Sequence, residues 1–72
     1  MLDALMLQYL AEIAKAKSNI KVYMENPVGI GEHPDLAAAV DSQIELIANA
    51  EDKMSVLQKY YDIGIPLYGQ TI

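Results

Sequence analysis

Residues 25–34 constrain the fold most, because they contain the strongest chain break in the sequence. Asn26 precedes Pro27, and a residue before proline is disfavoured in helical geometry. Gly29 and Gly31 can adopt positive φ at low cost. Long stretches with helical periodicity lie on both sides of this break. We therefore expect residues 25–34 to connect the two arms of an antiparallel helical hairpin.

The stretch before the connector repeats apolar residues at alternating spacings of four and three positions, which is the heptad rhythm of a helix seam. Its other residues are mainly Ala, Leu, Lys, Glu and Gln, which are good helix formers. We expect a helix over about residues 2–24. Its seam residues are Leu2, Met6, Tyr9, Ile13, Ala16, Ile20 and Tyr23.

The stretch after the connector follows the same rhythm, and we expect a second helix over about residues 35–61. Aligned in antiparallel order, the two seams match layer by layer, from Tyr23 opposite Leu36 to Leu2 opposite Leu57. The sequence therefore predicts an all-α fold, a two-helix hairpin with coiled-coil character. The second seam consists of Leu36, Val40, Gln43, Ile47, Ala50, Met54, Leu57 and Tyr61.

Gln43 is the polar residue in this otherwise apolar seam, and two interpretations stay open. It can fix the register or the oligomeric state, as a single polar seam residue does in coiled coils. Alternatively, it lies at the edge of the seam and reaches water.

The C-terminal tail, residues 62–72, is apolar and carries no charge after Asp62. Gly64 is a natural helix stop, and Pro66 prevents the helix from resuming. We expect this non-helical tail to pack on its own bundle or on a neighbour's, as an exchanged arm. In the connector, we expect Val28 and Ile30 to fold back and cover the open end of the hairpin.

Length and composition favour self-association. A chain of 72 residues buries only about 60% of its unfolded surface, and small chains usually need a disulfide, a metal or a partner subunit. There is no cysteine and only one histidine, so oligomerisation is the device left. We expect two hairpins to form a four-helix bundle, or a higher homo-oligomer. The expected interface residues lie outside the seam or in the tail: Leu5, Leu10, Ala14, Ile44, Ala48, Val56, Leu67 and Tyr68.

The charge balance argues against two classes of partner. The net charge is −5 and arginine is absent, whereas nucleic-acid binders cluster Lys and Arg to displace counterions. Anionic membranes also attract basic helical faces, so interfacial membrane binding through the first helix is disfavoured. No apolar run reaches the roughly 18–20 residues of a membrane span. The N-terminus lacks a positively charged leader, so we expect a cytoplasmic (host cell) or virion-associated location, without secretion by a signal peptide.

Glu32, His33 and Asp35 form the one place where a histidine and carboxylates meet. Such a group can hold zinc or manganese weakly, which gives the alternative function of a metal-binding site or small enzyme. The structural interpretation is a loop entering a helix, with acidic residues at the positive end of the helix dipole. We favour the structural interpretation, and expect no cofactor and no catalytic residue.

The runs Tyr23–Leu36 and Ala50–Met54 resemble small uncharacterised helical proteins of tailed phages, especially marine ones. The resemblance covers roughly residues 20–61. It implies a phage accessory or virion-associated protein that acts by assembly, and it brings no activity and no site residue. The combined expectation is a self-associating interaction or assembly protein rather than an enzyme.

Overall fold

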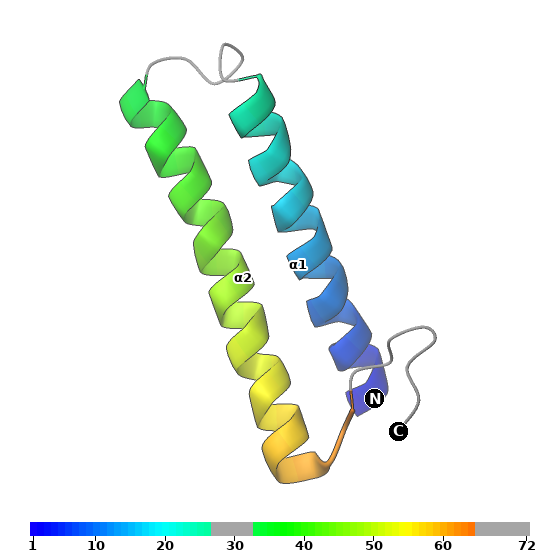
Figure 1. The fold of residues 1–72 in the computed structure, drawn as a ribbon. Coiled ribbons are helices and arrows are strands. Elements are labelled where there is room, and N and C mark those ends of the chain that lie inside the picture. The colour runs from blue at the N-terminus through cyan, green and yellow to red at the C-terminus, as the bar shows by residue number, and fades with distance from the viewer. Residues whose placement is uncertain (27–32, 65–72) are drawn as a thin grey trace.

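The computed structural model describes residues 1–26 and 33–64. Helices α1 (Leu2–Glu25) and α2 (His33–Tyr61) lie side by side and antiparallel (Figure 1). The predicted all-α hairpin is therefore confirmed. The helix α2 also includes His33 and Pro34, which the sequence pattern assigns to the connector. A proline in the first turn costs no intrahelical hydrogen bond, because the first backbone N–H groups of a helix have no partner there.

The seam predicted from the heptad pattern holds the two helices together. Met6, Ala16, Ala50, Met54 and Leu57 are buried, and all of them are predicted seam residues. The rest of the predicted seam is partly buried, with one exception. Two of the buried residues, Ala16 and Ala50, are small and allow the helix backbones to approach closely.

The exception is Tyr61, for which the seam prediction is wrong. Its side chain is 58% exposed. Leu57 already lies at the level of Leu2, where α1 begins. The last turn of α2 therefore extends past the start of α1, and α1 offers nothing to cover Tyr61.

The largest buried cluster lies where α1 begins and α2 ends, and it consists of Met6, Met54 and Leu57. Met6 is 0% exposed. Leu5 and Leu10, which the sequence analysis places on an intermolecular surface, are half-buried against this cluster. These two side chains are thus partly used within the hairpin, because they flank the seam closely enough to cover its methionines. The other residues packed against the cluster are Leu2, Tyr9, Ile13 and Ile63.

The helix α2 ends through a backbone reversal at Asp62, whose φ is 52°. The next residue, Ile63, donates its backbone N–H to the carbonyl oxygen of Leu57 at 3.2 Å. Its side chain folds back onto the buried cluster. The helix ends at Tyr61, at the boundary expected from the sequence. The residue with positive φ is Asp62, however, and not the expected Gly64. Aspartate tolerates the left-handed region better than most residues.

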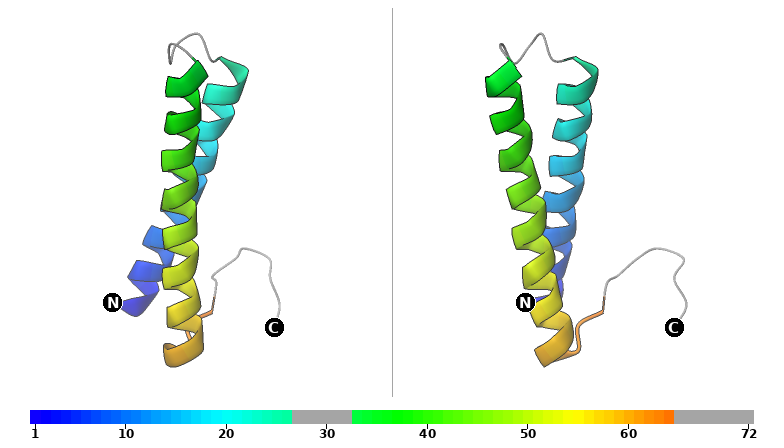
Figure 2. Two further views of the ribbon diagram at one scale, coloured as in Figure 1. Left: turned by 90° about the vertical axis from the view of Figure 1, so that its left-hand side faces the viewer. Right: turned by 60° about the vertical axis from the view of Figure 1, so that its left-hand side comes forward.

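Packing loosens toward the connector. Ile20, Tyr23, Leu36 and Val40 occupy the seam there and are only partly buried. Seen edge-on, the two helices cross at a shallow angle (Figure 2), as interlocking seams with heptad spacing require. The expected roles of Val28, Ile30 and the tail beyond Gly64 lie outside the described residues.

The buried methionine supports a direct test of the seam. We expect Met6→Ala to lower the free energy of unfolding by about 2–4 kcal/mol, because it removes buried apolar surface and leaves a cavity. The matched control is Met24→Ala, because Met24 is 64% exposed, and we expect a change within about 0.5 kcal/mol. The measurement is chemical denaturation followed by circular dichroism at one fixed protein concentration. Equal losses in the two variants would contradict this account of the core.

The reversal at Asp62 gives a second test. We expect Asp62→Gly to raise the free energy of unfolding by about 0.5–1 kcal/mol, because glycine adopts positive φ without steric cost. Asp62→Ala removes the same charge but keeps a Cβ atom, and we expect it to be less stable than the glycine variant by about 1 kcal/mol. Thermal denaturation of the three proteins decides the matter. An alanine variant as stable as the glycine variant would show that Asp62 is not held in the left-handed region.

Candidate interaction surfaces

Two surfaces flank the seam, one on each side, and each extends over both helices. We call the first the alanine face, and define it by Leu7, Leu10, Ala14, Ile44 and Ala48. We call the second the amide face. It is defined by Glu12, Asn19, Gln43, Leu46 and Val56.

The alanine face exposes apolar side chains that the seam does not use. Leu7 is 55% exposed and Ile44 is 50% exposed, while Ala14 and Ala48 are also on the surface. Leu10 is half-buried and joins this face to the core cluster. The five residues repeat at spacings of three and four over about two turns of α1 and one turn of α2, so they form a short second seam that lacks a facing helix. The next residues at the same spacing are charged, namely Lys17 on α1 and Glu51 on α2.

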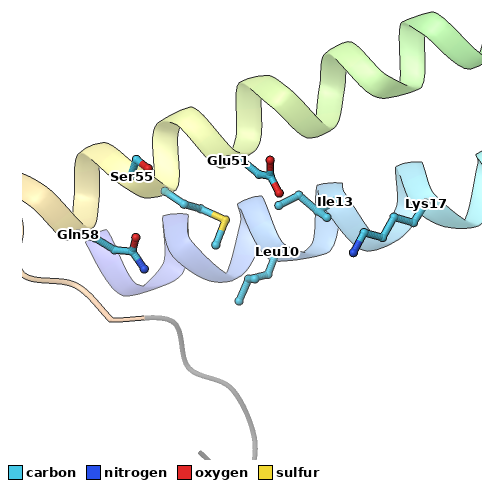
Figure 3. Close-up of a pocket in the computed structure, with 7 residues that line it drawn as sticks. Leu10, Ile13, Lys17, Glu51, Ser55 and Gln58 are labelled. Carbon is cyan, nitrogen blue, oxygen red and sulfur yellow. The ribbon is translucent and has the colours of Figure 1, made fainter. Parts of the chain in front are cut away.

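A groove of about 490 Å³ lies along the alanine face between the two helices. Leu10, Ile13 and Met54 provide its apolar lining. In Figure 3, Lys17 projects from α1, whereas Glu51, Ser55 and Gln58 project from α2, and all four belong to the lining. The lining of the groove thus combines three apolar side chains with a cation from α1 and with an anion and two neutral polar groups from α2.

The amide face carries polar contacts that the hairpin makes with itself. Asn19 on α1 donates its side-chain N–H to the side-chain oxygen of Gln43 on α2, with 3.1 Å between nitrogen and oxygen. Gln43 in turn donates to the hydroxyl of Ser42 at 3.5 Å, and that hydroxyl donates to the carbonyl oxygen of Ala39 at 2.8 Å. The groove on this side, of about 430 Å³, is lined by Glu12, Lys15, Ala16, Asn19, Gln43 and Leu46.

These contacts bear on the two interpretations of Gln43. Its side chain is half-buried, and its oxygen is used by the opposite helix. A shift of one helix along the other would separate the two amides and leave polar groups without partners, so the contact favours one register. Asn19 was not predicted as the partner of Gln43. Its position in the sequence could have indicated the contact, because Asn19 lies beside the seam one turn after Ala16. The antiparallel alignment places Ala16 opposite Gln43.

A second cross-helix contact was also not predicted. The ammonium nitrogen of Lys53 lies 5.5 Å from the centre of the Tyr9 ring, within the range of a cation–π interaction. Tyr9 is half-buried in the seam. Lys53 is exposed, so its ammonium group can contact both the ring and water.

The structure distributes the predicted interface residues unevenly. Ala14, Ile44, Ala48 and Val56 are exposed, as an interface needs. Leu5 and Leu10 are half-buried against the core cluster. Leu67 and Tyr68 lie outside the described residues. Exposed apolar residues that the sequence analysis did not select for the interface include Leu7, Val22, Met24 and Leu46.

The candidate metal site falls mostly outside the described part of the chain. Glu32 and the side chain of His33 are not among the described atoms, and Asp35 is exposed in the first turn of α2. Within residues 1–26 and 33–64, no three His, Cys, Asp or Glu side chains gather as metal ligands would. In the same residues, no helix has the length and apolarity to cross a membrane.

Comparisons with known proteins found no relative. No protein-family model matches the chain, and searches of curated proteins and of solved structures gave no match either. The resemblance to phage proteins therefore stays a prediction from the sequence.

A double-mutant cycle tests the amide contact. We expect Asn19→Ala and Gln43→Ala together to destabilise the hairpin less than the sum of the single variants, with a coupling energy of about 0.5–1.5 kcal/mol. The control cycle combines Gln43→Ala with Gln8→Ala, because Gln8 bonds Glu12 within its own helix. We expect no coupling there. Chemical denaturation provides the four free energies of each cycle, and a coupling near zero for Asn19 with Gln43 would remove the contact as a register determinant.

Proposed function

We propose that this protein acts by protein–protein assembly, as a helical hairpin that associates with a second copy of itself. The observation that carries the proposal is the unused second seam on the alanine face, where Leu7 and Ile44 are about half exposed. A helix usually has one apolar stripe that faces a core and a polar opposite side. In this hairpin the five residues of the alanine face, which lie beyond the seam, are apolar as well.

Two hairpins that bury these surfaces against each other would form a four-helix bundle. Such bundles pack antiparallel neighbours at shallow angles through seams of heptad spacing. The hairpin already contains one such pair of helices, so a second hairpin completes the bundle without rearrangement of the first. Assembly would then supply the second layer of core that a 72-residue chain needs for stability.

The solution mass of the intact chain tests the proposed function. We expect light scattering after size exclusion to give a mass of at least two chains at micromolar concentration. On dilution, the midpoint of thermal unfolding should fall, because association stabilises the folded state by mass action. A compact folded monomer over the whole concentration range would overturn the proposal.

A further inference from the structure

We infer that the alanine face is the surface on which the second copy docks, about a two-fold axis that crosses the hairpin at Ala14 and Ala48. This inference rests on the proposed self-association and adds the face, the axis and the direction of the second copy. The axis runs perpendicular to the helices. The connectors of the two copies therefore lie at opposite ends of the bundle.

The choice of face follows from the polar contacts. In the described part of the chain, the side-chain hydrogen bonds that involve Gln8, Asn19, Ser42 and Gln43 all lie on or beside the amide face. Lys53 covers the Tyr9 ring on that same side. These side chains already use their hydrogen-bonding groups within one hairpin. In the described residues, no side-chain hydrogen bond crosses the groove on the alanine face, so the charges of Lys17 and Glu51 there can pair with a second copy.

The position of the axis follows from the order of residues on each helix. Ala14 lies near the middle of α1 and Ala48 near the middle of α2. The antiparallel register brings the two alanines to about the same level, since Ile13 faces Ile47. A two-fold axis through them overlaps the two hairpins over their whole length. Each alanine then meets its own copy, and small side chains on the axis let the helices approach closely.

The residues one turn away from the axis are complementary across it. Leu10 precedes Ala14 and Lys17 follows it, while Ile44 precedes Ala48 and Glu51 follows it. The two-fold brings Ile44 of each copy over the groove lined by Leu10, Ile13 and Met54 of the other. It also brings Lys17 of each copy near Glu51 of the other. The contact of Ile44 with the groove and the pairing of Lys17 with Glu51 thus each occur twice, as an isologous interface requires.

A different two-fold, parallel to the helices, would pair the same faces in another way. It would place Ala14 over the second copy's Ala48 and bring both connectors to the same end. The two Lys17 side chains would then lie at one level with no Glu51 beside them. Charge complementarity therefore favours the perpendicular axis.

Single cysteines distinguish these arrangements cleanly, because the chain contains no cysteine. We would make Ala14→Cys and Ala48→Cys, with Asn49→Cys as a matched control that is exposed beside Ala48 but on the other side of the helix. Circular dichroism checks that each variant folds, and light scattering of the reduced proteins gives their mass. Mild oxidation then produces covalent dimers, which are followed with time on a non-reducing gel.

We expect Ala14→Cys and Ala48→Cys each to form a disulfide with its own copy at least about a hundredfold faster than Asn49→Cys. Docking holds the two thiols at an effective millimolar concentration, compared with micromolar for random collision. Fast bonding only in a mixture of the two alanine variants would overturn the perpendicular axis, and fast bonding of Asn49→Cys would overturn the face. In both cases a dimeric mass would leave the proposed self-association intact. A monomeric mass for the unmodified chain would overturn both proposals.

Discussion

Burial of the seam between α1 and α2 is the interaction on which every other feature of this protein depends. The chain has no disulfide to stabilise it, and the helices meet through one line of side chains. The largest buried cluster in that line lies toward the start of α1, where Met6, Met54 and Leu57 meet. Helices in proteins owe most of their stability to the packing of an apolar face against the rest of the fold. The stability of the hairpin therefore depends on this one seam, and apolar residues that pack beside the seam add to that stability.

Polar contacts at the margin of the seam contribute specificity more than stability. A partly exposed hydrogen bond such as that between Asn19 and Gln43 adds only about 1 kcal/mol. Heptad seams, however, match equally well after a shift of one repeat, so apolar pattern alone leaves the register poorly defined. A cross-helix amide pair and the Lys53 contact with Tyr9 penalise such shifts. Both contacts lie on the side of the amide face.

The sequence predicted the hairpin because two heptad series and one break determine it with little ambiguity. The buried residues Met6, Ala16, Ala50, Met54 and Leu57 all follow from periodicity. Periodicity ignores the ends of helices, so it assigned Tyr61 to the seam where no helix faces it. Turn propensity favoured Gly64 as the stop, yet the reversal occurs at Asp62. Asp62 and Gly64 can both adopt positive φ. The reversal occurs at Asp62 because the side chain of Ile63 can then pack against the core cluster.

The candidate interface was predicted only in part, for a related reason. The spacing of apolar residues distinguishes seam residues from surface residues. It does not show whether a residue at the edge of the seam packs against the core or faces solvent. Leu5 and Leu10 are long enough to reach the core from that edge, whereas Ala14 and Ala48 at neighbouring positions are not. The partner of Gln43 depended on the relative height of two helices, which the sequence gives to about one turn.

Different contacts on the two sides of the hairpin would allow one short chain both to fold and to assemble as proposed. If the same seam residues contacted the other helix of the hairpin and also a second copy, folding and association would compete for the same side chains. Here the amide face favours one register within one copy, and the groove on the alanine face is the proposed docking site for another. Leu10 connects that groove to the seam, since it packs against the core cluster and also lines the groove. Docking at the groove would bury Leu10 more deeply and so reinforce the seam beneath it, which couples assembly to the stability of each hairpin.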